Sequence, residues 1–415
     1  MSPARLKRLL LVALLVAVCA GVAMRVGNLT ATHNAPDEWS YTNQAALVLR
    51  EGHGAFPDLI AAFHGDTGLP PPTRAGFLYL LAGVMAVTGR TDLMPGIWLS
   101  CAASVISLLL VARIGWRFLG PTTAVFATVF YAVSSLPLMT SRRVWQDAAV
   151  ETLALLLILF GGEIVSGATH WGWSLGFCVT GAACLTMKEM PTAIFLLISA
   201  CVLVSLVRRS SGTTQLVVFI GIWIVSVVAA VSWLIFLLGD WRPLVEYPRL
   251  TSAFLANGTY SRNYESGSAL DLMHGFLLVS PFAALCFLLG LIVLMAPKFF
   301  TAAAESRLMA YFLAAFTVLL MAVAVIVPHH LNFRYICPAF GPFYLVAGLG
   351  FSGTIGTIMR YLSMPQRRVF AGCCGLAILF YASGDALTFE NHFARTEVRD
   401  MSIRMVLNPE AADEL

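Results

Sequence analysis

The chain begins with an apolar run, LLLVALLVAVCAGVAMRV (residues 9–26), and a polar segment, HNAPDEWSY (residues 33–41), follows it. An apolar run of this length can cross about 30 Å of hydrocarbon as a helix. The polar segment places two adjacent carboxylates, Asp37 and Glu38, directly after that span. Carboxylates at the edge of a membrane are hydrated, paired or functional. The stretch therefore predicts a membrane protein with a candidate site at the exit of its first helix.

The composition supports the same fold class over the whole chain. Of 415 residues, 59% are hydrophobic and 12% are charged, whereas soluble domains are about 45–50% apolar. The net charge of +4 comes from scattered basic residues, which argues against a nucleic-acid partner. The nine cysteines lie in apolar runs without the spacing of a metal or redox site. We therefore expect an all-α, polytopic integral membrane protein.

The hydrophobic runs predict about eleven transmembrane helices. Residues 1–387 then form one transmembrane domain, and residues 388–415 form a short tail on its outer face. The first run follows Arg5, Lys7 and Arg8, and it is interpreted as a signal anchor rather than a cleaved signal peptide. The predicted spans are 8–27, 95–113, 121–139, 147–166, 171–187, 190–207, 214–238, 272–296, 308–328, 335–354 and 369–387.

The basic residues set the predicted topology. With a cytoplasmic amino terminus, the inner loops carry the paired Arg and Lys residues that the positive-inside rule requires. This holds only if residues 73–88, which follow Pro70-Pro71-Pro72, lie along the membrane as an outer juxtamembrane helix. Residues 38–50 predict a second such helix. The outer face then collects the loops 28–94 and 239–271 and most of the chemically interesting residues.

Carboxylates in two segments are the candidates for catalysis. Asp37 is the candidate general base, with Glu38 as a supporting carboxylate, because a hydroxyl nucleophile needs a positioned proton acceptor. Asp147 is the second catalytic candidate, and Glu151 lies one helical turn later on the same face. The alternative interpretation is that these acids only cap helices and interact favourably with the helix dipole. Whether Asp37 or Asp147 is the base stays open.

Cations on the same predicted face are candidates for binding a phosphate. An Arg on the outer side runs against the positive-inside trend, which favours an anionic ligand, and Lys supplies a point charge for phosphate. Snorkelling anchors, a polar turn and an aromatic belt are the alternatives. The candidates for the donor phosphate are Lys188, Arg334, Tyr335 and one of Arg142 or Arg143. Arg74, Glu151 and His330 are further candidate residues of the site.

These segments, in this order, resemble the GT-C superfamily of membrane glycosyltransferases, in the branch of the protein O-mannosyltransferases and the bacterial lipid A aminoarabinose transferases. The matching features are Asp37-Glu38, Pro70-Pro71-Pro72, Gly120 after Arg113 and Arg117, Ser141 to Asp147, Leu185 to Glu189, and Asn332 to Tyr335 with Pro338. Family members often carry a basic residue before the proline pair. Here Gly68-Leu69 stands there, and Arg74 is the candidate replacement.

The resemblance implies a function and its partners. It implies an inverting glycosyltransferase that moves a sugar from a polyprenyl-phosphate donor to a lipid, glycan or protein hydroxyl. The site would face the periplasm from a bacterial inner membrane. The cofactor is unknown; a divalent metal ion, with Glu38 and His330 as ligand candidates, is considered. A transporter or flippase of lipid-linked sugars is an alternative, although the spans lack internal repeats and central ionisable residues. A non-catalytic subunit of the same fold is another.

Overall fold

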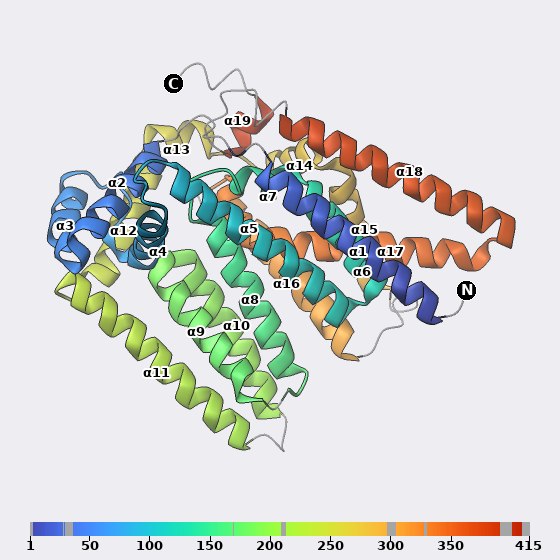
Figure 1. The fold of residues 1–415 in the computed structure, drawn as a ribbon, viewed down its shortest axis with the longest axis horizontal. Coiled ribbons are helices and arrows are strands. Elements are labelled where there is room, and N and C mark those ends of the chain that lie inside the picture. The colour runs from blue at the N-terminus through green and yellow to red at the C-terminus, as the bar shows by residue number, and fades with distance from the viewer. Residues whose placement is uncertain are drawn as a thin grey trace. The chain divides into compact units, whose positions relative to one another are not determined.

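The computed structural model is helical throughout (Figure 1) and describes residues 3–27, 29, 36–168, 170–208, 213–296, 304–327, 330–390 and 401–408. Within these residues, β structure is limited to one antiparallel bridge between Asn332 and Ser402. The α-helices are α1 Pro3–Val26, α2 Pro36–Glu51, α3 Phe56–Gly65, α4 Ala75–Thr88, α5 Met94–Ile114, α6 Pro121–Val133, α7 Ser135–Thr140, α8 Asp147–Val165, α9 Trp171–Met187, α10 Glu189–Arg208, α11 Thr213–Leu238, α12 Pro243–Asn257, α13 Thr259–Tyr264, α14 Ala269–Val279, α15 Pro281–Met295, α16 Ala304–Ile326, α17 Phe340–Tyr361, α18 Met364–Phe389 and α19 Ile403–Leu407. Shorter helical turns are η1 Gly52–Ala55, η2 Pro72–Arg74, η3 Gly115–Leu119 and η4 Phe333–Ala339.

The prediction of an all-α polytopic membrane protein is confirmed. In the described part of the chain, 8 helices are long and apolar enough to cross a membrane. A bent pair, α14 and α15, raises this number to 9 if the two count as one span. The 8 helices are Ala4–Val26, Met94–Leu119, Asp147–Val165, Glu189–Arg208, Thr214–Leu238, Glu305–Ile326, Phe333–Tyr361 and Met364–Phe389.

Three predicted spans differ from simple crossings. The span 121–139 is broken at Ser134, and the span 272–296 turns by 120° at Ser280. At the second break Pro281 begins α15 and has no N–H for a continuous helix. The Ser280 hydroxyl donates to Asp385 Oδ2 at 2.8 Å. The third, 171–187, is a regular helix of only 17 residues.

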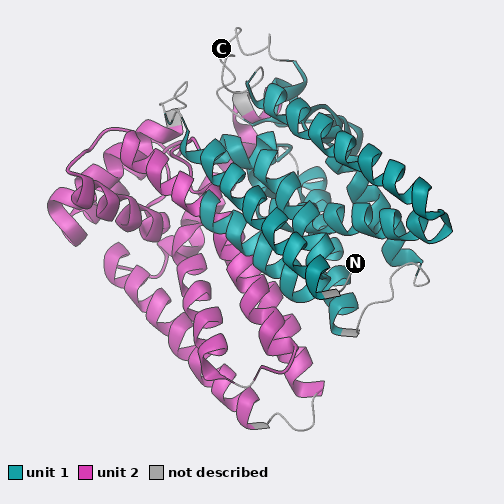
Figure 2. Ribbon diagram, turned by 45° about the vertical axis from the view of Figure 1, so that its right-hand side comes forward, with its two compact units in different colours: residues 1–33, 104–141, 264–415 teal, residues 34–103, 142–263 magenta. Residues whose placement is uncertain are grey.

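The chain forms two compact units (Figure 2), and the first comprises residues 1–33, 104–141 and 264–415. In this unit α17 packs against α6 and α15, and α1 packs against α6. A Cβ on Gly350 would lie 2.1 Å from the Cys286 backbone oxygen, so glycine permits the close approach of α17 to α15. Arg25 of α1 is fully buried and donates to the Ala132 carbonyl at 3.0 Å, which ties α1 to the end of α6.

The second unit comprises residues 34–103 and 142–263. Here α2 packs on α4, and α9 packs on α4, α8 and α11. The two predicted juxtamembrane segments, 38–50 and 73–88, are indeed helices, α2 and α4. Their position outside the membrane stays a prediction. The helices α3 and α12 in the predicted outer loops were not expected, because neither contains a long apolar run.

Candidate functional site

The buried face of α2 organises the predicted site in the second unit. Glu38, Tyr41, Ala45 and Val48 recur at helical spacing and are each 3% exposed or less. Proline begins the helix, and Asp37 and Glu38 occupy its first turn, where carboxylates are favoured by the helix dipole. The result is a helix whose amino-terminal half buries polar groups and whose carboxyl-terminal half buries apolar ones.

Glu38 and Arg143 form a bidentate ion pair. Arg143 donates from Nε to Glu38 Oε1 at 3.1 Å, and its terminal nitrogen lies 2.9 Å from Oε2. The backbone N–H of Val144 also donates to Oε1, at 2.7 Å. The guanidinium lies over the Trp145 ring, 4.4 Å from its centre. Both charged side chains are almost fully buried, and their bidentate geometry is the strong form of such a pair.

Tyr41 joins this helix to the turn after the prolines. Arg74 donates to the Tyr41 hydroxyl at 2.6 Å and to Glu189 Oε2 at 3.4 Å. The Gln146 amide is satisfied when its oxygen accepts from Tyr41 and Arg74 and its nitrogen donates to the Met187 carbonyl at 2.6 Å. Tyr41, Arg74, Gln146 and Glu189 thus connect four segments that are distant in sequence.

Asp37 lies half-buried near Arg74. Burial by itself would lower the pKa of Arg74, but Tyr41, Glu189 and Asp37 together raise it above its ordinary value. Arg74 therefore carries its charge at every pH at which the protein is folded, although its side chain is only 12% exposed. A partly accessible carboxylate and a permanent cation therefore interact electrostatically.

Lys188 and Asp147 form the third ion pair. The ammonium lies 3.3 Å from Asp147 Oδ1, and the side chains are 9% and 1% exposed. Lys188 is an extended residue between α9 and α10, and Asp147 is the first residue of α8. Glu151, one turn later, is also fully buried, as the predicted shared face requires. Arg142 is half-buried beside Arg143.

Helix α5 contacts the turn that carries the two arginines. A Cβ on Gly96 would lie 2.3 Å from a methyl group of Val144, and the Ser100 hydroxyl donates to the Trp145 carbonyl at 3.2 Å. Glycine at position 96 therefore allows residues 144–145 to approach the helix closely. These contacts with α5 hold residues 144–145, which lie just before α8.

The remaining candidates, His330, Arg334 and Tyr335, belong to the first unit. Arg334 and Tyr335 lie half-buried at the start of η4, and the His330 and Tyr335 rings lie 4.9 Å apart. Asn332 caps this turn: its side-chain oxygen accepts from the Arg334 N–H at 2.9 Å, and its amide donates to Glu265 at 2.9 Å. The predicted site residues therefore divide between the two units.

Among the described residues, no group of three His, Cys, Asp or Glu side chains is placed to hold a metal ion. Glu38, one of the ligand candidates, is occupied by Arg143. The described residues therefore offer no ready metal centre.

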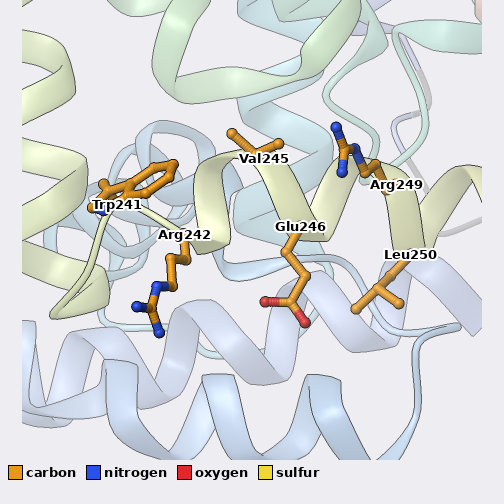
Figure 3. A pocket seen from close by; sticks show the side chains of 6 residues that line it. All are labelled: Trp241, Arg242, Val245, Glu246, Arg249 and Leu250. Carbon is orange, nitrogen blue, oxygen red and sulfur yellow. The ribbon is translucent and has the colours of Figure 1, made fainter.

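A hollow of about 370 Å³ lies along α12 in the second unit (Figure 3). It contains none of the predicted site residues, and its lining combines apolar and charged side chains: Trp241, Arg242, Val245, Glu246, Arg249 and Leu250.

Sequence reasoning missed three polar residues of the second unit: Tyr41, Gln146 and Glu189. Tyr41 carried a usable signal, because it follows Glu38 by three residues and so shares its helix face. Gln146 and Glu189 stand directly beside Asp147 and Lys188 in the motifs already selected. Their partners, however, come from distant segments.

We refer below to the charged cluster, which comprises nine residues of the second unit: Asp37, Glu38, Arg74, Arg142, Arg143, Asp147, Glu151, Lys188 and Glu189.

Comparisons with known proteins agree with this fold. Residues 71–239 match the family described as dolichyl-phosphate-mannose-protein mannosyltransferase. That range contains the whole charged cluster except Asp37 and Glu38. A comparison with curated proteins found no match.

Solved structures with a similar fold include ArnT from Cupriavidus metallidurans bound to undecaprenyl phosphate, with a TM-score of 0.57 and 14% identity over 99% of this chain and 79% of that one. The archaeal oligosaccharyltransferase AglB from Archaeoglobus fulgidus, in complex with an inhibitory peptide and a dolichol-phosphate, has a TM-score of 0.57 and 12% identity over 92% of this chain. The match spans 56% of the AglB chain.

These matches and the eight or nine apolar helices define an integral, multi-pass membrane protein with the fold of membrane glycosyltransferases. The resemblance to the GT-C superfamily inferred from the sequence is confirmed at the level of the fold, and the family match over residues 71–239 agrees with it.

Proposed function

We propose that the chain is a glycosyltransferase that moves a sugar from a polyprenyl-phosphate donor to an acceptor hydroxyl. One observation carries the proposal: within one unit, the partly buried cations Arg74 and Lys188 lie in the same cluster as the carboxylates Asp37 and Asp147. Sugar transfer from a lipid phosphate needs both kinds of group, a base for the acceptor and cations for the phosphate. The family match over residues 71–239 supports the same class.

The proposed reaction is a single displacement at the anomeric carbon. The base takes the proton of the acceptor hydroxyl while its oxygen bonds to that carbon from the face opposite the phosphate. The bond between the carbon and the phosphate oxygen breaks, and its electron pair stays on the phosphate. In-line attack inverts the anomeric configuration. Arg74 and Lys188 stabilise the charge that grows on the leaving phosphate.

Asp37 is the better candidate for the base. It is half-buried and lies in the first turn of α2, whereas Asp147 is 1% exposed at its side chain and held by Lys188. A general base must reach the hydroxyl from which it takes a proton. Glu38, which is occupied by Arg143, supports the helix on which Asp37 lies.

The donor is proposed as a sugar on a polyprenyl phosphate because ArnT and AglB have been solved with undecaprenyl phosphate and a dolichol-phosphate. AglB was also solved with a peptide. The acceptor is therefore left as a hydroxyl of a lipid, a glycan or a protein. Arg334, Tyr335 and Arg142 stay predicted contacts of the donor phosphate.

The test is transfer by the purified full-length chain in lipid nanodiscs, with a panel of radiolabelled polyprenyl-phosphate sugars and lipid, glycan and peptide acceptors. Asp37→Asn should lower turnover by about 10²–10⁴, the usual contribution of a general base. The matched control is Asp92→Asn, which removes a half-exposed carboxylate of the same region and should leave turnover unchanged. Turnover of Asp37→Asn within a few-fold of the wild type would exclude Asp37 as the base.

The outcomes also separate the alternatives. Donor binding without transfer to any acceptor points to a non-catalytic subunit of the same fold. Movement of an intact lipid-linked sugar across a proteoliposome membrane points to a flippase.

We propose that this site faces the periplasm of a bacterial inner membrane, with the amino terminus in the cytoplasm. The Arg-bearing loops predicted on the inner side support this orientation. Arg90 has a side chain that is 48% exposed, just beyond α4. A cysteine at that position in a cysteine-free chain should react with an impermeant thiol reagent from the periplasm. Labelling only from the cytoplasm would overturn the orientation.

A further inference from the structure

The ion pairs of the charged cluster differ in the geometry of their contacts. In the Glu38–Arg143 pair both carboxylate oxygens accept from the guanidinium, and a backbone N–H adds a third bond. The Lys188 ammonium lies 3.3 Å from Asp147 Oδ1, farther than the 3.1 and 2.9 Å of the contacts between Arg143 and Glu38. A longer contact from an ammonium is weaker than the bidentate contact of a guanidinium, and it is therefore easier to exchange.

Lys188 is also the cation of the charged cluster whose side chain is best suited to exchange one anionic partner for another. Its ammonium has three donors that rotate freely, unlike the rigid fork of an arginine. Its side chain is 9% exposed, against 1% for Arg143. Lys188 has an extended backbone in the break between α9 and α10.

The net charge of the charged cluster also bears on how the cluster could hold a phosphate. Five carboxylates and four cations give the charged cluster a formal charge of −1 when all are ionised. A phosphodiester adds a further negative charge, and transfer of the sugar leaves a phosphate with more. A buried anion needs cations that are not already neutralised. Within the charged cluster, a bound phosphate therefore competes with the carboxylates for the cations.

We propose that Asp147 occupies the place of a donor phosphate oxygen on Lys188, and that the donor binds by displacing it. This inference rests on the proposed function and adds to it a competition inside the site. Asp147 thereby weakens the binding of phosphate in the resting protein and protects Lys188 from remaining a buried, uncompensated charge. In the exchange a phosphate oxygen replaces the carboxylate oxygen on the ammonium, and no covalent bond changes.

The test is the affinity for undecaprenyl phosphate, titrated into the purified full-length chain in phosphatidylcholine nanodiscs. Asp147→Asn keeps the shape of the side chain and removes its charge, so the phosphate should bind about tenfold more tightly, the effect of about 1.4 kcal/mol. Lys188→Met should weaken binding at least tenfold. Asp92→Asn, the matched carboxylate control, should change nothing. Equal or weaker binding by Asp147→Asn would overturn the competition, since a purely supporting Asp147 predicts that result.

A second measurement covers the case in which Asp147→Asn folds poorly because Lys188 loses its anion. Undecaprenyl phosphate added during purification should then restore the folded fraction more than it does for the wild type, because ligand binding stabilises the folded state. No such recovery would count against the competition. Failure of the proposed function gives a different result: the phosphate binds, with the predicted order of affinities, but no sugar is transferred.

Discussion

Replacing Arg143 by methionine tests whether the Glu38–Arg143 pair supports the architecture of the cluster. The change leaves the Glu38 carboxylate buried with the Val144 N–H, while the contacts at 3.1 and 2.9 Å disappear. Removing one partner of a buried ion pair costs about 3–5 kcal/mol, because the other charge stays in a low-dielectric environment. The contact with Trp145 at 4.4 Å is lost as well and adds about 0.5–2 kcal/mol.

The chain offers a matched control in Arg90 and Asp92, an ion pair whose side chains are 48% and 50% exposed. Arg90→Met should lower the unfolding temperature far less than Arg143→Met, because water solvates the remaining aspartate. The assay is thermal unfolding in detergent micelles with both variants compared side by side. The double variant Glu38→Leu with Arg143→Met should be more stable than Arg143→Met alone, since it removes the stranded charge. Equal losses in Arg143→Met and Arg90→Met would refute the argument from burial.

Two further changes test packing and the placement of Arg74. Gly76→Ala should destabilise the protein by about 1–3 kcal/mol in the same unfolding assay, because the added Cβ would lie 2.3 Å from the Thr186 hydroxyl. Gly83→Ala on the same helix meets nothing within 4 Å and should be neutral or stabilising; a ranking in the other direction would contradict the described contact of α4 with α9. Tyr41→Phe should cost about 1 kcal/mol and weaken donor binding severalfold, because Arg74 loses its shortest hydrogen bond, at 2.6 Å. Unaltered donor affinity would show that Tyr41 does not position Arg74.

Hydropathy predicted the helices well because a long apolar run in a membrane has few alternatives to a helix. It failed where a helix breaks inside such a run. The break at Ser280 is accompanied by a hydrogen bond to Asp385, and the break at Ser134 by one to the Tyr344 hydroxyl. Both partners lie far along the chain, and no local pattern of polarity indicates them.

The candidate site shows the same limit. The motifs selected segments whose charged side chains form ion pairs in the second unit, since charged residues are rare in this chain and gather at the ends of helices. The motifs did not indicate which acidic side chain forms an ion pair with which basic side chain. Glu38 is 105 positions from Arg143, and Lys188 is 41 from Asp147. Such pairings depend on how the helices pack, and residue spacing along one helix does not encode that packing.

The bridge between Asn332 and Ser402 has a consequence for how the protein is made. The Phe333 N–H donates to the Met401 carbonyl at 3.0 Å, and the Ile403 N–H donates to the Leu331 carbonyl at 3.2 Å. The turn that carries Arg334 therefore acquires these bonds only after residues 401–403 have been synthesised. A nascent chain that ends before residue 401 would contain the eight apolar helices described above but would lack the partners of Leu331 and Phe333.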